Sequence, residues 1–271
     1  MTIFVDDTTC TRCGICSVVC PIRIIEPADE KTPPWVKDEK AGMCIACGHC
    51  EVCCPTQALL LNVRPEERVS LPAGAGILSP DDLGIYLKKR RSVRHYTKEP
   101  VLKETIEAIL DIARYAASGG NAQPVRWLVV QDPMEVHRLA GLTVDWMKTI
   151  TNSRHPMSGY VPSLIAAWEH GYDPICRNAP HLVIAHIPEG NPGATIDAII
   201  ALTHFDIAAP SFDIGTCWAG FLSIAAASYE PLQKALDLPA GRKYAYGLMF
   251  GHPLYKIHGI PRRNPLQVTW R

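Results

Sequence analysis

The apolar positions of residues 80–271 follow two different periods, which indicates a mixture of helices and strands. Spacings of three and four residues predict helices over 80–89, 102–116, 135–150 and 193–212. Compact apolar runs bounded by turn-forming residues predict strands at 127–131, 181–187 and 244–250. Helices outnumber strands, so this part of the chain is predicted to be an α+β domain. The segment 151–173 mixes both patterns with several Gly and Pro residues, and we interpret it as a mobile cover.

A boundary between two domains is indicated just before the first of these helices. Residues 62–80 are rich in Pro, Gly and charge and follow neither period, as is typical of a linker. Ser79, Pro80 and Asp81 then form a helix start, with a capping hydroxyl, a proline in the first turn and an acid at the positive end of the helix dipole. We therefore predict a small domain at 1–61, a linker at 62–80 and a larger domain at 81–271.

Composition excludes some classes of protein. Lys and Arg total 27, as do Asp and Glu, so the 271-residue chain lacks the basic excess of a nucleic-acid binder. The N-terminus has no secretory signal, and the longest apolar stretch, 194–214, is interrupted by Asp197, His204, Asp206 and Pro210. We interpret that stretch as a buried core helix, and we expect a cytoplasmic protein without a nucleic-acid or membrane partner.

The most specific chemistry lies in the first fifth of the chain, which holds nine of the eleven cysteines. Two runs have the spacing C-x2-C-x2-C-x3-C-P, and two such runs are the bacterial signature for a pair of [4Fe-4S] clusters. The runs consist of Cys10, Cys13, Cys16 and Cys20, and of Cys44, Cys47, Cys50 and Cys54.

In this signature the fourth cysteine of each run ligates the other cluster. We therefore assign Cys54 to the cluster held by Cys10, Cys13 and Cys16, and Cys20 to the cluster held by Cys44, Cys47 and Cys50. The crossing would tie both halves into one domain that has little apolar core. Cys53 adjoins Cys54 but breaks the three-residue gap, and we expect it to be a small buried hydrophobic residue.

Structural zinc is the alternative for these cysteines, because paired C-x2-C units also bind zinc. A zinc site takes four ligands in two pairs, whereas this chain has two triplets, each with a trailing Cys-Pro. Disulfides are less favoured still, because the chain shows no secretory signal. The spacing therefore favours electron-carrying clusters.

Four segments of the larger domain suggest a second redox site. Arg90–Arg94 could hold a phosphate with guanidinium and hydroxyl donors, although a charged run is more often a solvated face. Ser118–Pro124 is a glycine-rich loop with two amides, and Gly215–Gly220 is a turn of small residues that could approach a flat ring. Arg263, near the C-terminus, offers further charge. Neither a Rossmann nor a Walker motif is present.

Together these segments resemble the motifs of the nitroreductase superfamily of FMN enzymes over residues 81–271, and the whole chain resembles its ferredoxin-fused subgroup. The resemblance implies a ferredoxin-like 2[4Fe-4S] domain followed by an α+β domain with a central, mostly antiparallel sheet and surrounding helices. It also implies FMN bound at a homodimer interface. The FMN-binding residues that it implies are Arg90, Arg91, Ser92, Arg94, Asn121, Gln123, Cys217, Trp218, Ala219, Gly220 and Arg263. Val125 stands where the family has Trp.

The resulting functional prediction is an oxidoreductase that passes electrons from two [4Fe-4S] clusters to FMN and on to a small acceptor. The acceptor would be a nitroaromatic, a quinone-like or other conjugated electrophile, or free flavin, and the donor a ferredoxin or an NAD(P)H-linked reductase. No protein side chain is required as a catalytic residue, because the cofactor carries the chemistry. The alternatives are a non-catalytic electron relay and a flavin-transforming or dehalogenating member of the same fold.

Overall fold

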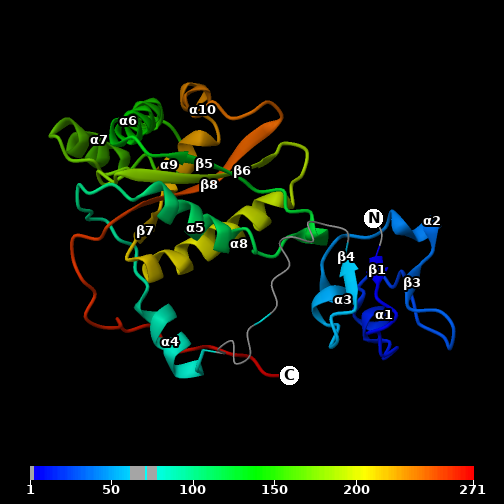
Figure 1. Cartoon of the computed structure of the whole chain (residues 1–271). Helices are drawn as coiled ribbons and strands as arrows, with labels where there is room; N and C mark the ends of the chain where they lie inside the picture. Colours follow the sequence, from blue (N-terminus) through cyan, green and yellow to red (C-terminus); the bar gives the residue numbers. More distant parts are fainter. Residues whose placement is uncertain (1–2, 62–70, 72–77) are drawn as a thin grey trace. The chain divides into compact units, whose positions relative to one another are not determined.

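The computed structural model describes residues 3–61, residue 71 and residues 78–271 (Figure 1). The chain forms two compact units, one of residues 1–77 with Gly120–Ala122 and one of residues 78–119 and 123–271. Most of the predicted linker lies outside the described residues. Its last residue, Pro80, already belongs to the first helix of the second unit.

The first unit is built from short elements around the two cysteine runs. In chain order these are β1 Ile3–Val5, α1 Ile15–Val19, β2 Ile25–Glu26, β3 Trp35–Val36, α2 Asp38–Ala41, α3 His49–Val52 and β4 Leu59–Leu61. Strands β1 and β4 pair antiparallel, as do β2 and β3. None of these strands was predicted, because runs of two or three residues are too short to show a period.

The repeat in the sequence is also a repeat of backbone conformation. Left-handed φ angles occur at matching positions of the two runs: Arg12 (54°) and Ala46 (53°), Gly14 (74°) and Gly48 (77°), and Arg23 (54°) and Gln57 (57°). The residue before α1 and the residue before α3 are therefore both glycines in a conformation that other residues adopt at a cost. Each cysteine triplet thus winds the chain in the same way.

The second unit contains one four-stranded antiparallel sheet, in the order β5-β6-β8-β7. This arrangement confirms the predicted α+β fold with a central antiparallel sheet. The strands are β5 Arg126–Val130, β6 His181–Pro188, β7 Gly215–Trp218 and β8 Arg242–Gly251. The helices are α4 Pro80–Lys89, α5 Lys103–Ala113, α6 Pro133–Ile150, α7 Val161–Glu169, α8 Ala194–Ala208, α9 Gly220–Ala226 and α10 Glu230–Leu236, with short 3-10 turns at Gly119–Asn121 and Ala209–Phe212.

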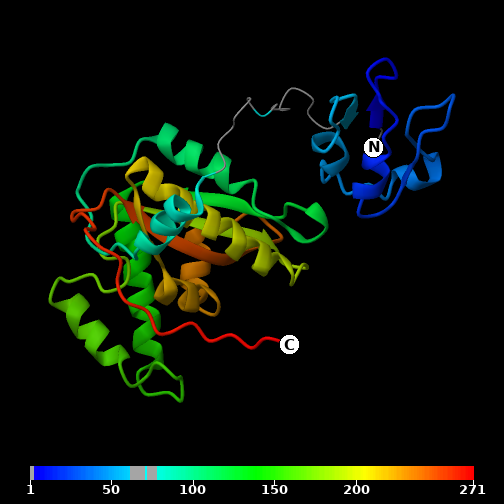
Figure 2. The ribbon, with the colours of Figure 1, turned by 90° about the horizontal axis from the view of Figure 1, so that it is seen from below.

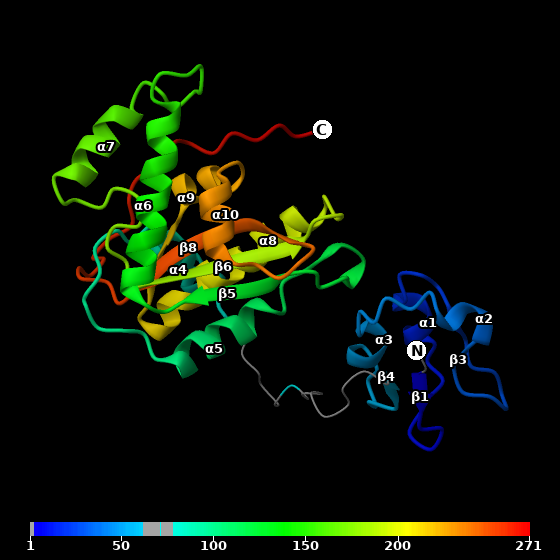
Figure 3. The ribbon, with the colours of Figure 1, turned by 90° about the horizontal axis from the view of Figure 1, so that it is seen from above.

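Helices cover both faces of this sheet. Successive residues of β6 point to opposite faces, so Leu182 and Ile184 pack with α6, α9 and α10, whereas Val183 and Ala185 pack with α5 and α8. Figure 3 shows α6 and α7 side by side on the first of these faces. Because both faces are covered, β6 is buried over nearly its whole length.

The helix starts agree with the capping residues in the sequence. Ser79 Oγ accepts a hydrogen bond of 3.0 Å from Asp82 N at the start of α4, as predicted. Asp132, two residues after the end of β5, caps α6 by accepting a bond of 2.9 Å from Met134 N. The predicted helix 102–116 ends earlier, at Ala113, and the predicted helix 193–212 divides into α8 and a 3-10 turn.

One predicted turn is in fact a strand. Residues 215–218 form β7, an edge strand that pairs with β8, with Gly215 opposite Gly251. Four residues that include a glycine give no strand period, so the pairing is fixed by the neighbouring strand and not by local preference. Helices α9 and α10, which follow, were not predicted either.

The predicted core helix at the apolar stretch 194–214 is largely as expected. Ala198, Leu202 and Phe205 of α8 are buried. No helix among the described residues combines the length and apolar character needed to cross a membrane. Beyond β8, residues 254–271 run as an extended, almost wholly exposed segment, seen in red in Figure 2.

Gly251 is expected to be essential to the packing between β8 and the start of β6. A Cβ atom there would lie 2.6 Å from Cγ and 2.7 Å from Cδ of Pro180, whose ring cannot move aside. Gly251→Ala should therefore destabilise the second unit by about 1–3 kcal/mol. Thermal unfolding followed by tryptophan fluorescence measures this, with Gly190→Ala, which meets nothing within 4 Å, as the matched control. Equal melting temperatures for the two variants would contradict the expectation.

Candidate functional site

The first unit has two cavities, each lined by four cysteines. Three cysteines of one run and the last cysteine of the other line each cavity. The first cavity is lined by Cys20, Cys44, Cys47 and Cys50, and the second by Cys10, Cys13, Cys16 and Cys54. All eight predicted ligands are therefore gathered in the two crossed sets that the spacing predicts.

Cys53 differs from the prediction. It is exposed and is not among the residues that line either cavity. Cys53 caps the end of α3 next to Cys54, and because the Cys54 side chain lines a cavity, that of its neighbour is left facing solvent. The expectation of a buried Cys53 was therefore wrong, whereas the preference for Cys54 as the cavity residue agrees with the structure.

The electrostatics of the first cavity fit a metal cluster. Burial, and after it the nearby Cys47, Cys20 and Cys44 thiols, together raise the pKa of Cys50 to about 12. Four thiols in an apolar pocket resist deprotonation, because the resulting thiolates would repel one another. They lose their protons together only when a cationic group is present. A metal cluster supplies that charge, and its binding is coupled to the release of the protons.

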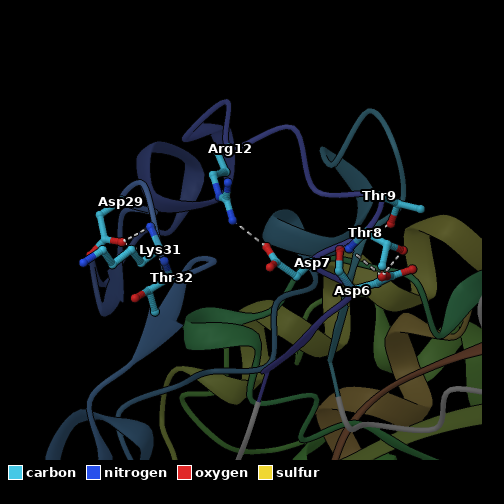
Figure 4. A network of polar contacts seen from close by, with 8 residues as sticks. All are labelled: Asp6, Asp7, Thr8, Thr9, Arg12, Asp29, Lys31 and Thr32. Atoms are coloured by element: carbon cyan, nitrogen blue, oxygen red, sulfur yellow. Dashed lines mark hydrogen bonds and ion pairs between the residues drawn. The ribbon is translucent and has the colours of Figure 1, made fainter.

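A polar network fixes the loop that leads into the first run (Figure 4). Asp6 Oδ1 accepts hydrogen bonds from the backbone N–H and the hydroxyl of Thr8, at 2.9 and 2.6 Å, and Asp6 O accepts one of 3.0 Å from Cys10 N. Arg12 pairs with Asp7 at 3.0 Å. The network places Cys10 through backbone bonds, and the exposed ion pair adds little stability.

In the second unit, residues Arg90–Arg94, the arginine-rich segment, pair through their backbone with edge strand β7. Val93 N donates to Thr216 O at 2.8 Å, and Ser92 forms a parallel bridge with Thr216. The backbones approach so closely that a Cβ on Gly215 would lie 2.6 Å from a Val93 methyl carbon. Two of the predicted motifs, more than a hundred residues apart in sequence, are thereby brought together.

A buried carboxylate, Asp206 of α8, joins the same two motifs. Its Oδ2 atom lies 3.4 Å from Arg90 NH1 and accepts a hydrogen bond of 3.2 Å from Trp218 Nε1. Its Oδ1 atom accepts a short bond from the Thr216 hydroxyl. In the sequence, Asp206 stands out only as a charged residue within an apolar stretch. A charge at a buried position of a core helix is the feature that could have indicated its contacts with the site.

The arginines of the segment fit an anionic group. Arg91 NH1 is buried and has no hydrogen-bond partner among the described residues. A buried guanidinium nitrogen without a partner is costly, and a phosphate oxygen is a partner that would satisfy it. Arg94 is exposed and donates to Ser92 O at 3.4 Å, whereas Arg263 lies in the exposed C-terminal segment.

Cys217 of β7 has the environment of a packing residue. The side chain is buried, and burial raises the pKa of its thiol despite the opposing effect of Arg94. A thiol that stays protonated is a poor nucleophile. We therefore interpret Cys217 as a packing residue and not as a nucleophile.

The backbone after β7 is held in place from behind. Ala219 N donates to Gly247 O at 2.9 Å, and Ser223 Oγ donates to Ala219 O at 2.8 Å. Ser223 Oγ also lies at hydrogen-bond distance, 2.7 Å, from Tyr244 Oη. The turn at Ala219–Gly220 is therefore a rigid surface of small residues, suited to a flat ring.

The two predicted amide contacts lie in other surroundings. Asn121 is grouped with the first unit, where its side-chain amide donates to Ile45 O at 3.0 Å and to Ala46 O at 2.9 Å. The backbone N–H of Gln123 donates to Ser118 Oγ at 3.0 Å. The contacts of the two side-chain amides with FMN stay a prediction.

The predicted cover, 151–173, contains helix α7, which packs against α6. Tyr160 at the start of α7 lies 6.4 Å, between ring centroids, from Phe221 of α9, next to the Ala219–Gly220 turn. Trp168 stacks on His137 of α6 at 4.5 Å. At the far end, buried Asp173 accepts bonds of 2.8, 2.9 and 3.0 Å from the backbone N–H groups of residues 175, 176 and 178.

These features define a class of protein. Two four-cysteine cavities, and an arginine-rich segment attached to the edge of an antiparallel sheet flanked by helices, belong to an iron–sulfur protein with a second, anion-binding domain. The comparisons with known proteins identify both parts. Residues 9–59 match the 4Fe-4S dicluster domain, and residues 87–252 match the nitroreductase family. The chain belongs to the nitroreductase family of FMN-dependent oxidoreductases and carries an N-terminal iron–sulfur domain, as predicted.

Several relatives are known. An FMN reductase [NAD(P)H] of Bacillus subtilis is 28% identical over 182 residues, which are 65% of this chain and 68% of that protein. An iodotyrosine deiodinase of Thermotoga neapolitana is 23% identical over 61% of this chain and 86% of its own length. A 5,6-dimethylbenzimidazole synthase of Rhodospirillum rubrum is 42% identical over 52 residues, 19% of this chain and 25% of its own.

Solved structures share the fold of the second unit. Oxidized iodotyrosine deiodinase bound to FMN and 3-iodo-L-tyrosine superposes with a TM-score of 0.55, 22% identity and coverage of 70% of this chain and 98% of the other. An FMN-bound nitroreductase of Bacteroides fragilis gives a TM-score of 0.53, 22% identity and coverage of 69% and 99%. At this identity the likeness is one of fold.

The cavity geometry separates Cys54 from its neighbour Cys53. Cys54→Ser should lower the iron content, because it removes one of the four sulfurs that line the second cavity. Cys53→Ser should leave the iron content unchanged. Iron and acid-labile sulfide per chain, measured on anaerobically purified protein, test this. Loss of iron in Cys53→Ser alone, or equally in both variants, would contradict it.

Proposed function

We propose that this protein is an oxidoreductase that accepts electrons at two [4Fe-4S] clusters in its first unit and delivers them, with FMN in its second unit, to a small acceptor. The acceptor class is a nitroaromatic, a quinone-like or other conjugated electrophile, or free flavin. The observation that carries the proposal is the coexistence, in one chain, of crossed four-cysteine cavities and a buried guanidinium nitrogen, Nη1 of Arg91, that has no hydrogen-bond partner in the described part of the chain.

For the clusters, the crossed lining of the cavities supports the predicted ligand sets. Cys54 would complete the set of Cys10, Cys13 and Cys16, and Cys20 the set of the second run. Among the described residues, no three Cys, His, Asp or Glu side chains converge as ligands of a single metal ion. Sulfurs spread around a cavity suit a multinuclear cluster better than a single zinc ion.

For FMN, the donors around β7 suggest which end of the molecule each would hold. The side chains of Arg90, Arg91, Ser92 and Arg94 would bind the phosphate and ribityl chain. The backbone from Cys217 to Gly220 would face the ring. Asn121, Gln123 and Arg263 remain expectations from the resemblance to the family.

When bound, FMN supplies the redox chemistry. The protein's own residues bind and orient it. The hydroxyl of Ser223, which is paired with that of Tyr244, engages the Ala219 carbonyl at 2.8 Å and would help to hold the turn that faces the ring. Buried Cys217 keeps its proton and so does not compete as a nucleophile. No side chain of this site has to act as an acid or base for the chain to transfer electrons.

A dehalogenating or flavin-transforming activity is the second candidate. It is favoured by the relatives that are iodotyrosine deiodinases and a benzimidazole synthase, together with a structured cover beside the ring turn. Product analysis separates the candidates, since halide release, flavin breakdown and nitro reduction give different products. A non-catalytic relay would instead turn over no small acceptor and would exchange electrons only with a protein partner.

We also propose that the protein acts as a homodimer that receives electrons from a ferredoxin or an NAD(P)H-linked reductase. The resemblance to the family suggests the dimer. The exposed apolar side chains of α4 and of the C-terminal segment, such as Ile85, Leu266 and Trp270, are in keeping with a covered surface. Light scattering of the purified holoprotein measures the oligomeric state, and a monomer would refute this part.

Cofactor content is the first test of the proposal. Anaerobically purified protein should contain about eight iron atoms and about one FMN per chain, as expected for two cubanes and one flavin site. With dithionite as the reductant, it should then reduce a nitroaromatic or a quinone. Zinc in place of iron would overturn the cluster assignment, and full cofactor content without turnover of any acceptor would favour the relay.

The two cofactor sites should respond independently to substitution. Arg94→Ala removes a cation from the predicted phosphate site and should weaken FMN binding about tenfold or more, the usual effect of losing a charge-assisted hydrogen bond. Iron content should not change. Arg114→Ala, which removes an exposed arginine at the end of α5, is the charge-matched control. Loss of both cofactors in Arg94→Ala would indicate misfolding and not a role in the site.

A further inference from the structure

Asp206 is a buried carboxylate in an otherwise apolar helix. It is 4% exposed and lies on α8 among residues such as Leu202 and Phe205 that form the core. Burying a carboxylate costs free energy unless hydrogen bonds and a cation compensate for the lost water. The structure supplies both, and the partners that it supplies are informative.

All three partners of Asp206 belong to the predicted flavin motifs. Arg90 comes from the arginine-rich segment, and Thr216 and Trp218 come from β7. The ion pair with Arg90 joins its Nη1 atom to Oδ2 of Asp206 at 3.4 Å. A guanidinium has five N–H donors, so this contact orients the group without using up its capacity to bind an anion.

The backbone around Arg90 is fastened on both sides of this pair. Before it, the hydroxyl of Tyr86 in α4 donates at 2.6 Å to Ile207 O, the residue next to Asp206. After it, Val93 N donates at 2.8 Å to Thr216 O. Asp206 therefore lies between two fixed points, where a side-chain contact can decide the direction of a long and otherwise adaptable arginine.

We propose that Asp206 is a positioning residue for FMN. Asp206 aims the Arg90 guanidinium at the phosphate end of the cofactor and fixes the side chain of Trp218 beside Arg90. This inference rests on the proposed FMN site. Nothing in the motifs of the chain assigns Asp206 a role. It places a third element, α8, behind the binding site formed by the arginine-rich segment and β7.

The sign of the effect distinguishes positioning from a mere nearby charge. A carboxylate close to a phosphate dianion repels it, so if Asp206 acted by charge alone, Asp206→Asn would bind FMN more tightly. If Asp206 aims Arg90, the same substitution releases the arginine and binds FMN more weakly, although a repulsive charge has been removed. The two hypotheses therefore predict changes in opposite directions.

The experiment is a titration of the full-length apoprotein with FMN, followed by quenching of flavin fluorescence. Asp206→Asn should raise the dissociation constant about tenfold, which corresponds to the loss of one charge-assisted contact. Asp145→Asn, which removes an equal charge from an exposed pair with Lys148 on α6, should leave it unchanged. Iron content and melting temperature report whether each variant is folded.

A double-mutant cycle tests the route through Arg90. In an Arg90→Gln background, Asp206→Asn should change the dissociation constant by less than about twofold, because the residue through which Asp206 acts is already absent. An undiminished effect in that background would mean that Asp206 acts through β7 alone and would overturn the proposal. So would unchanged or tighter FMN binding by Asp206→Asn.

A second variant keeps the test decisive if Asp206→Asn does not fold. Asp206→Glu keeps the charge but moves it by one methylene, so positioning predicts weaker FMN binding whereas a simple charge effect predicts none. If the wild-type protein binds no FMN at all, the proposed function fails first. If the wild type binds FMN and these variants do so equally well, only the role of Asp206 fails.

Discussion

The second unit depends on the close pairing of the arginine-rich segment with strand β7. The Val93–Thr216 backbone bond of 2.8 Å requires an approach so close that only glycine fits at Gly215. This one contact brings together side chains from two distant parts of the sequence, so that the arginines lie next to the residues of β7. Strand β7 in turn is ordered by its pairing with β8, so the site inherits its geometry from the central sheet.

The first unit is governed by a different constraint, the scarcity of apolar core. Among the described residues its buried cluster has six members, all of which also line the two cavities, and two of the six are the cysteines Cys16 and Cys50. A core this small gives little stability by itself, and buried thiols with raised pKa values hold back the deprotonation that ligation needs. Cluster binding would relieve both problems, so folding and metal content of this unit should be coupled.

How much the sequence predicts depends on whether the signal is local. Ser79 could be predicted as a helix cap because such a cap is decided within four residues. The crossed cysteine sets followed from spacing alone. Strand β7 and the role of Asp206 could not be predicted in this way, because both depend on partners far along the chain. The exposure of Cys53 shows the same limit, since it depends on how α3 ends, although the spacing had already favoured Cys54 as the cavity residue.

Acceptor choice must come from parts of the protein other than the cofactor, because flavin chemistry is shared across a fold that serves many reactions. The segment 151–173 is the best placed to exert it. Its helix, α7, begins just after Tyr160, whose ring lies near that of Phe221. Phe221 directly follows the Ala219–Gly220 turn that would face the ring of FMN. At the far end of the segment, Asp173 accepts a hydrogen bond from the backbone N–H of Cys176. Burial raises the pKa of the Cys176 thiol, and the nearby Asp173 and Cys217 contribute to the same shift. A segment that begins beside this turn would discriminate acceptors by shape, without contributing any reactive group.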